Sequence, residues 1–322
     1  MVKRSKKDIV ENALNSDQDL YESVKRRLSK AHPNSVITFV FMRQLDKDGL
    51  PRSARATSNS LINIRVGHAG NNNDAGVALY AGELCKIIGG VFHDNLNNGI
   101  SLEAASNRNQ IVGATCNSNT GGVGEQGLVI SNGLMNSVTG GYFEGNAGDG
   151  IELDNSYLTA ISGVNCRSNG GNGILVQAAT GNGGYNAVSG SICSSNTGYG
   201  VMTAHAGAFT EYYDAIVGNA IYDNTAGEIA LDTLTICRHN AGFVTENSGS
   251  DTIANGTTTK EVTHGCSYTP SLADITITLG EDPTNSPGAV FVDTLGPVTF
   301  AVKCENDPGA SNLDFGWSVR RH

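Results

Sequence analysis

The middle of the chain repeats one short pattern of apolar and polar positions six times. Each copy has an apolar residue and a glycine, a short alternating stretch, an asparagine, a turn, and a glycine that starts a second alternating stretch. Alternation with period two predicts short β-strands. The repeated asparagines lie 24, 27, 23, 27 and 28 residues apart, at Asn95, Asn119, Asn146, Asn169, Asn196 and Asn224.

A repeat of this length has no room for a helix between its strands, so the strands must wind as a coil. The pattern therefore predicts an all-β fold, a right-handed single-stranded parallel β-helix of about seven coils, each rising about 4.8 Å. We expect the asparagines to adopt the left-handed conformation in tight turns and to stack as an amide ladder. The repeated glycines are expected to supply positive φ where the next strand begins, at Gly99, Gly127, Gly150, Gly173, Gly200 and Gly227.

The cysteines fit the same repeat. Three residues before each ladder asparagine is a position predicted to point inward, occupied by Phe92, Cys116, Phe143, Cys166, Cys193 and Ile221. Three of the seven cysteines thus become small apolar core residues. No two cysteines form a CxxC pair, which argues against a zinc site and a disulfide framework. We expect neither a metal nor a cofactor.

The flanking segments differ from the repeat, so the chain divides into residues 1–58, 59–244 and 245–322. Residues 5–15 and 17–31 carry apolar residues at helical spacing, and the second stretch is basic. These N-terminal helices either dock on a larger particle or cap the first coil, whose open edge needs cover. Residues 245–322 show alternating strands between Gly, Pro and Asn turns, which predicts an antiparallel, sandwich-like C-terminal β module.

Charge narrows the possible partners. The 322 residues carry a net charge of −10, and residues 87–237 hold two basic residues against twelve acidic ones. Such a surface repels nucleic acids and anionic sugar polymers, whereas neutral glycans stay compatible. No run reaches the roughly 18 apolar residues of a membrane span. No apolar stretch follows the basic N-terminus, so we expect no signal peptide and synthesis in the cytoplasm.

Lengthening connections between coils suggest where a ligand could bind. The turns after residues 153, 176 and 203 grow longer and should stack into a ledge on one side of the rod. A tyrosine ring can pack on the apolar face of a sugar, and a carboxylate accepts hydrogen bonds from hydroxyl groups. The ledge therefore predicts a glycan-binding set made of Tyr185, His205, Glu211, Tyr212, Tyr213 and Asp214.

A candidate catalytic pair lies beside this ledge. Glu152 and Asp154 should both point outward from one strand, because Ile151 and Leu153 point inward. Two positions on a strand separate their carboxyl groups by roughly 6 to 7 Å, near the boundary between retaining and inverting glycosidases. The alternative is that both are ordinary solvated acids. A lyase or epimerase is less favoured, since the body has few basic residues.

The coil repeat resembles the right-handed β-helix family that includes pectate lyases and phage tailspikes. The C-terminal segments Val262-Thr-His-Gly265, Thr269-Pro270 and Phe315-Gly-Trp-Ser-Val319 resemble small β modules that end tail-fibre and tailspike proteins. This resemblance implies a viral or prophage adhesin, in a virion or extracellular, that forms a homotrimer and binds or degrades cell-surface polysaccharide. Two alternatives stay open: a polysaccharide-degrading enzyme, and an architectural subunit of a virion or filament.

Overall fold

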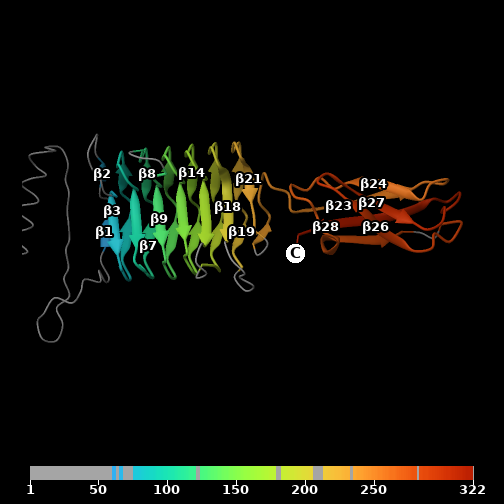
Figure 1. Ribbon diagram of the computed structural model, residues 1–322, viewed down its shortest axis with the longest axis horizontal. Coiled ribbons are helices and arrows are strands. Elements are labelled where there is room, and N and C mark those ends of the chain that lie inside the picture. The colour runs from blue at the N-terminus through green and yellow to red at the C-terminus, as the bar shows by residue number, and fades with distance from the viewer. Residues whose placement is uncertain are drawn as a thin grey trace, which may run out of the picture.

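The computed structural model describes residues 60–62, 65–67, 75–120, 124–178, 183–205, 213–232, 235–280 and 283–321. The helices expected between residues 5 and 31 lie outside this range. Within the described part of the chain, no helix has the length and apolarity that a membrane crossing requires. Figure 1 shows a stack of parallel strands followed, along the same long axis, by a smaller group of antiparallel strands.

The stack is the expected parallel β-helix, and its three sheets run along the rod. Strands β3 to β20 make six successive sets of three, with parts of further coils at both ends. Sheet I contains β1 (Ser60–Ile62), β4 (Lys86–Ile88), β7 (Gln110–Val112), β10 (Ser137–Thr139), β13 (Ala160–Ser162), β16 (Ala187–Ser189), β19 (Ala215–Val217) and β22 (Ile236–Arg238). Sheet II contains β2 (Arg65–Gly67), β5 (Val91–His93), β8 (Thr115–Asn117), β11 (Tyr142–Glu144), β14 (Asn165–Arg167), β17 (Ile192–Ser194) and β20 (Ala220–Tyr222). Sheet III contains β3 (Val77–Tyr80), β6 (Ile100–Glu103), β9 (Leu128–Ser131), β12 (Ile151–Asp154), β15 (Ile174–Ala178), β18 (Tyr199–His205) and β21 (Gly227–Ala230).

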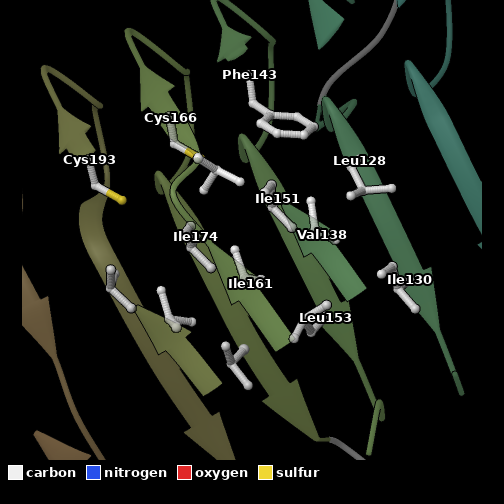
Figure 2. Close-up of a cluster of buried hydrophobic side chains, with 14 of the residues drawn as sticks. Leu128, Ile130, Val138, Phe143, Ile151, Leu153, Ile161, Cys166, Ile174 and Cys193 are labelled. Carbon is white, nitrogen blue, oxygen red and sulfur yellow. The ribbon is translucent and has the colours of Figure 1, made fainter. Parts of the chain in front are cut away.

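Inward side chains form columns along the rod because neighbouring coils pair in register. Phe143 pairs with Cys116 on one side and Cys166 on the other, and Cys166 pairs with Cys193. Figure 2 shows Phe143, Cys166 and Cys193 in a row above the branched aliphatic residues of the other sheets. All members of the predicted inward column are fully buried. The prediction that these cysteines are core residues is confirmed, and burial raises the pKa of the Cys116 and Cys166 thiols.

The asparagine ladder is also confirmed. Each side-chain Nδ2 donates to Oδ1 of the asparagine on the next coil, at 2.8 Å from Asn95 to Asn119 and 2.9 Å from Asn169 to Asn196. The prediction that these asparagines are left-handed is wrong. The positive φ belongs to the residue before each one, as at Ser168 (φ 56°), which leaves the amide free to reach along the axis.

The expected role of the repeated glycines also needs correction. Of that set, Gly227 has a positive φ, whereas the others do not. A Cβ at Gly150 would lie 2.6 Å from the carbonyl oxygen of Gly173 and 2.9 Å from Nδ2 of Asn169. Glycine is required there because successive coils approach closely. The left-handed glycines form a different column, which includes Gly163 (φ 63°).

The C-terminal module consists of two antiparallel three-stranded sheets. Sheet IV has the order β23–β28–β25 and sheet V the order β24–β27–β26, with bounds Glu246–Ile253 (β23), Thr259–Thr263 (β24), Ile275–Leu279 (β25), Val290–Leu295 (β26), Thr299–Cys304 (β27) and Leu313–Arg320 (β28). A single 3₁₀ turn, Leu272–Asp274, precedes β25. The core of the C-terminal module includes Phe300. The Trp317 ring packs edge-on against the Phe300 ring, with the two ring centroids 5.8 Å apart.

Side chains tie the module to the last coils. Tyr268 packs against both hydrophobic cores. Arg321 donates from Nη2 to the Asp232 carbonyl oxygen at 3.1 Å, and its guanidinium lies 5.8 Å from the centroid of the Tyr268 ring. The chain therefore returns from the far end of the module to the β-helix, where Arg321 contacts the last coil.

Candidate functional site

The outer surface of sheet III carries the predicted acidic pair. On β12, Ile151 and Leu153 are fully buried, whereas Glu152 and Asp154 are half-buried on the outside. This alternation places both carboxylates on one face of the strand, as expected. Gln177 on β15 donates from Nε2 to Oε1 of Glu152 at 2.5 Å. An amide therefore holds the Glu152 carboxyl group at the centre of the sheet surface.

A third acid, Asp149, was not predicted as part of this group. It lies in the turn before β12, where its Oδ1 accepts hydrogen bonds from the backbone N–H and the side-chain Nδ2 (2.9 Å) of Asn172. Asn172 in turn accepts from the backbone N–H of Tyr199 at 2.9 Å. This second polar ladder explains the burial of Asp149 and brings its charge close to Glu152.

Burial and like charge act together on the acids. Burial raises the pKa of the Glu152 carboxyl, and the charges of Asp149 and Asp154 raise it further, against the hydrogen bond from Gln177. Burial also raises the pKa of Asp149 and of Asp154. A glutamic acid that keeps its proton to higher pH can donate it, so Glu152 has the environment of a general acid.

The predicted ledge residues separate into buried and exposed groups. His205 and Asp214 were expected on the surface, yet their side chains are 5% and 0% exposed. Asp214 takes a position that asparagine holds on other coils, and its Oδ1 accepts the backbone N–H of Asn186 at 2.7 Å. Aligning it with Asn109, Asn136 and Asn186 would have predicted this burial. Glu211 and Tyr212 lie outside the described residues.

His205 lies between two carboxylates. Its Nε2 is 3.1 Å from Oδ2 of Asp214, an ion pair without the alignment of a hydrogen bond, and its Nδ1 bonds Oδ2 of Asp232. Asp214 and Asp232 together raise the pKa of His205 to about 9, against burial. The imidazolium neutralises the acid in the ladder. Asp214 and Asp232 face opposite nitrogens of the His205 ring. Among the described residues, no group of three acidic, histidine or cysteine side chains could hold a metal ion.

Two predicted tyrosines stay accessible. Tyr185 is 41% exposed and Tyr213 is 48% exposed. They immediately precede Asn186 and Asp214, which bond each other across one coil spacing. The Tyr185 ring packs edge-on against Tyr157, with centroids 5.5 Å apart, which fixes its orientation. The set of glycan-binding residues predicted from the sequence did not include Tyr157, because no polar or acidic motif marks its position.

The two arginines between residues 87 and 237, Arg108 and Arg167, are both engaged in ion pairs. Nη1 of Arg108 lies 2.8 Å from Oε1 of Glu83, and Arg167 pairs with Glu144 at 2.5 Å. Neither guanidinium is left to bind an anionic ligand without breaking its pair. This agrees with the expectation that neutral ligands suit the body better than anionic ones.

Comparison with known proteins finds fold likenesses. No family model and no curated protein matches the chain. Similar structures include a mannuronan C-5 epimerase A-module of Azotobacter vinelandii, at 16% identity and TM-score 0.41 over 57% of this chain and 58% of that one. The Dettilon tailspike protein matches at 11% identity and TM-score 0.42, over 82% of this chain and 80% of that one. A tailspike of Acinetobacter baumannii bacteriophage AP22, in complex with capsular saccharide, matches at 10% identity and TM-score 0.38, over 83% and 61% of the two chains.

The chain spans 58%, 50% and 57% of the lengths of the first three matched structures, all of them epimerases. With TM-scores below 0.5, these likenesses assign no activity.

Proposed function

We propose that this chain binds a neutral cell-surface glycan through the outer surface of sheet III, as a tailspike-like adhesin of a virion or of the extracellular space. The observation that carries the proposal is the Glu152 site: a half-buried carboxyl held by Gln177 beside Asp154, on the outer face of sheet III. The carboxylates there can accept hydrogen bonds from sugar hydroxyls, and the amide can both accept and donate such bonds. The paired arginines favour an uncharged ligand over a polyuronate.

The exposed tyrosines supply the apolar part of such a site. Tyr185 and Tyr213 present ring surface on successive coils, and ring faces pack on the C–H faces of sugars. Their spacing along the rod is about 4.8 Å, one coil. A linear glycan lying along the rod could therefore meet several ring and carboxylate groups, each contributing modestly. The proposed adhesin is a homotrimer, which would multiply these weak contacts by avidity.

A second candidate function is glycoside hydrolysis at the same site. The raised pKa of Glu152 favours it, because a general acid must hold its proton near neutral pH. In this scheme the Glu152 carboxylic acid protonates the glycosidic oxygen as its bond to the anomeric carbon breaks. Asp154 then stabilises the positive charge on the sugar or activates the attacking water. A lyase or epimerase and a purely architectural role are weaker alternatives.

Variants of the two acids separate binding from hydrolysis. Glu152→Gln, Asp154→Asn and the wild type would be tested for binding to a panel of neutral polysaccharides and for release of reducing ends. Asp223→Asn is the matched control, since Asp223 is an exposed acid just after β20, at the end of a sheet II strand rather than on the outer surface of sheet III. Weaker binding in both variants but not the control supports the site. Unchanged binding in both variants would refute it.

Loss of reducing-end release in Glu152→Gln, with binding retained, would establish the hydrolase. No release by the wild type on any polysaccharide would sink the hydrolase and leave the adhesin. Sedimentation equilibrium of the wild type tests the trimer. A mass of 33.5 kDa, that of one chain, would contradict it.

A further inference from the structure

Sheet II, whose strands β8 and β14 are labelled in Figure 1, carries a compact group of four outward side chains. On β11, Tyr142 and Glu144 are two residues apart and lie on the same face of the strand. On the next coil, β14 places Asn165 beside Tyr142 in parallel register, and it places Arg167 beside Glu144. With about 4.8 Å between strands and about 6.6 Å between alternate residues, the four side chains mark the corners of a rectangle. We call this group the Tyr142 quartet.

The polar members of the quartet keep hydrogen-bonding capacity for a ligand. Arg167 donates from Nε (3.2 Å) and from Nη2 (2.5 Å) to one oxygen, Oε1 of Glu144. Within the described part of the chain, Oε2 of Glu144, Nη1 of Arg167 and the side-chain amide of Asn165 have no hydrogen-bond partner. The ion pair therefore orients one free acceptor and one free donor, and the amide offers one group of each kind.

The Tyr142 ring is the apolar member of the quartet. It is 58% exposed. The corner of the coil beside it carries no side chain, because Gly140 (φ 61°) and Gly163 (φ 63°) stand at the turns that lead into β11 and β14. A Cβ built on either glycine would meet nothing within 4 Å. The ring is therefore open to a ligand along the edge between sheets I and II.

The surroundings of the quartet select the class of partner. Tyr142 lies between Thr115 and Asn165 on the neighbouring coils, and Asn165 separates it from Ile192, so no contiguous apolar patch forms as in the core of a protein interface. Arg167 is paired with a carboxylate, which leaves no unpaired cation for an anionic polymer. A neutral pyranose fits both features, because its C–H face can pack on the tyrosine ring while its adjacent hydroxyl groups meet carboxylate, guanidinium and amide groups.

We propose that the Tyr142 quartet binds one neutral pyranose unit of a glycan, with the sugar ring against Tyr142 and its adjacent hydroxyl groups against the three polar side chains. This is a second glycan-binding site, on a different sheet from the Glu152 site, and it does not depend on that site. Contacts to a single sugar unit give weak binding. Sites on two sheets of one rod gain from avidity where a surface presents many glycan chains.

Titration of the full chain with simple glycosides tests the proposal. The probes are the methyl glycosides of glucose, galactose and mannose, with the methyl glycoside of glucuronic acid as the anionic comparison. The readout is the NMR shift of the Tyr142 ring in a chain with isotope-labelled tyrosine, and the spectrum of Tyr142→Thr identifies its signals. The expected result is a saturable shift, with a Kd in the millimolar range, for at least one neutral glycoside. No shift with any of the three neutral glycosides would overturn the proposal.

Two variants test the polar members of the quartet. Asn165→Ala should weaken neutral glycoside binding by about tenfold, the loss expected for one or two hydrogen bonds. Glu144→Gln should weaken it as well and should strengthen binding of the glucuronic acid glycoside, because the Arg167 guanidinium is released from its ion pair. Wild-type affinity in both variants would overturn the assigned quartet. A wild-type preference for the glucuronic acid glycoside would overturn the neutral ligand.

Two control variants separate this site from the rest of the surface. Tyr222→Thr removes a tyrosine that is 48% exposed on β20 of the same sheet but lies outside the quartet. Glu152→Gln alters the sheet III site and leaves the quartet intact. Both should keep the wild-type Kd measured at the Tyr142 ring, and thermal unfolding verifies that all variants are folded. A loss of Tyr142 shifts in Glu152→Gln would overturn the independence of the two sites, whereas failure of the Glu152 site alone leaves these shifts unchanged.

Discussion

Replacing Asp214 by asparagine changes the charge of a buried cluster while keeping its hydrogen bond. Asp214 accepts the backbone N–H of Asn186 at 2.7 Å, at a ladder position where Asn109 bonds Asn136 on earlier coils. The side-chain oxygen of asparagine can accept the same bond. The variant therefore keeps the ladder and removes one of the two carboxylates that hold the proton on His205.

The structure sets the size and sign of the effect. The pKa of His205 is about 9 in the folded chain, above its ordinary value of 6.5. Because the folded pKa is the higher one, this stabilisation is fully present below pH 6.5 and is lost as the pH rises through about 9. At about 1.4 kcal/mol for each pKa unit, the wild type should lose about 3 kcal/mol across this window. Asp214→Asn should lose clearly less.

Above pH 9 the order of stability should reverse. There the wild type buries the Asp214 carboxylate beside a neutral imidazole, whereas the variant buries a neutral amide. Urea unfolding of both chains between pH 6 and pH 10 measures this crossover, and the NMR titration of His205 measures its pKa. Asp223→Asn, at an exposed acid of the neighbouring turn, is the control. Wild-type stability that does not fall from pH 6.5 to 9.5, or an equal fall in Asp214→Asn, would refute this account of the cluster.

Two further predictions concern the rod itself. Asn169→Ala should destabilise the chain by about 3 kcal/mol or more in urea unfolding, because it leaves the buried Nδ2 of Asn146 without its acceptor and the Phe143 carbonyl oxygen without its donor. A cost below about 1 kcal/mol would show that the ladder contributes little. Gly150→Ala should cost about 1 to 3 kcal/mol through its clash with the next coil. Gly163→Ala, with open space around its Cβ, should cost about 1 kcal/mol from backbone strain alone, and an equal cost at both positions would contradict the steric explanation.

The repeat made the rod predictable, because the position of a residue in the coil determines whether its side chain points inward, joins the asparagine ladder or lies in a turn. The inward cysteines and the asparagine ladder follow from spacing alone. The conformations do not, since the left-handed φ sits one residue before each asparagine, at Ser168 rather than Asn169. Likewise, Gly150 is explained by the approach of the next coil, a contact between residues 23 positions apart.

The module and the site show where the sequence alone falls short. Strand β23 (Glu246–Ile253) has no alternating apolar pattern, because its residues are mostly polar, and its strand conformation comes from eight paired positions along β28. The outward acids Glu152 and Asp154 were predictable from alternation. The burial of Asp214 follows from aligning it with the ladder asparagines. The burial of His205 was not predictable, because it depends on Asp232, a residue 27 positions away that returns beside it one coil later.

The most direct test of the central claim is equilibrium binding to purified neutral and uronate-containing polysaccharides across a range of salt concentrations. The account predicts binding to a neutral glycan with an affinity that changes little with salt, since Arg108 and Arg167, the two arginines between residues 87 and 237, are each paired with a glutamate. It also predicts that Glu152→Gln weakens this binding. Binding only to polyuronates, with an affinity that falls steeply as salt rises, would contradict it.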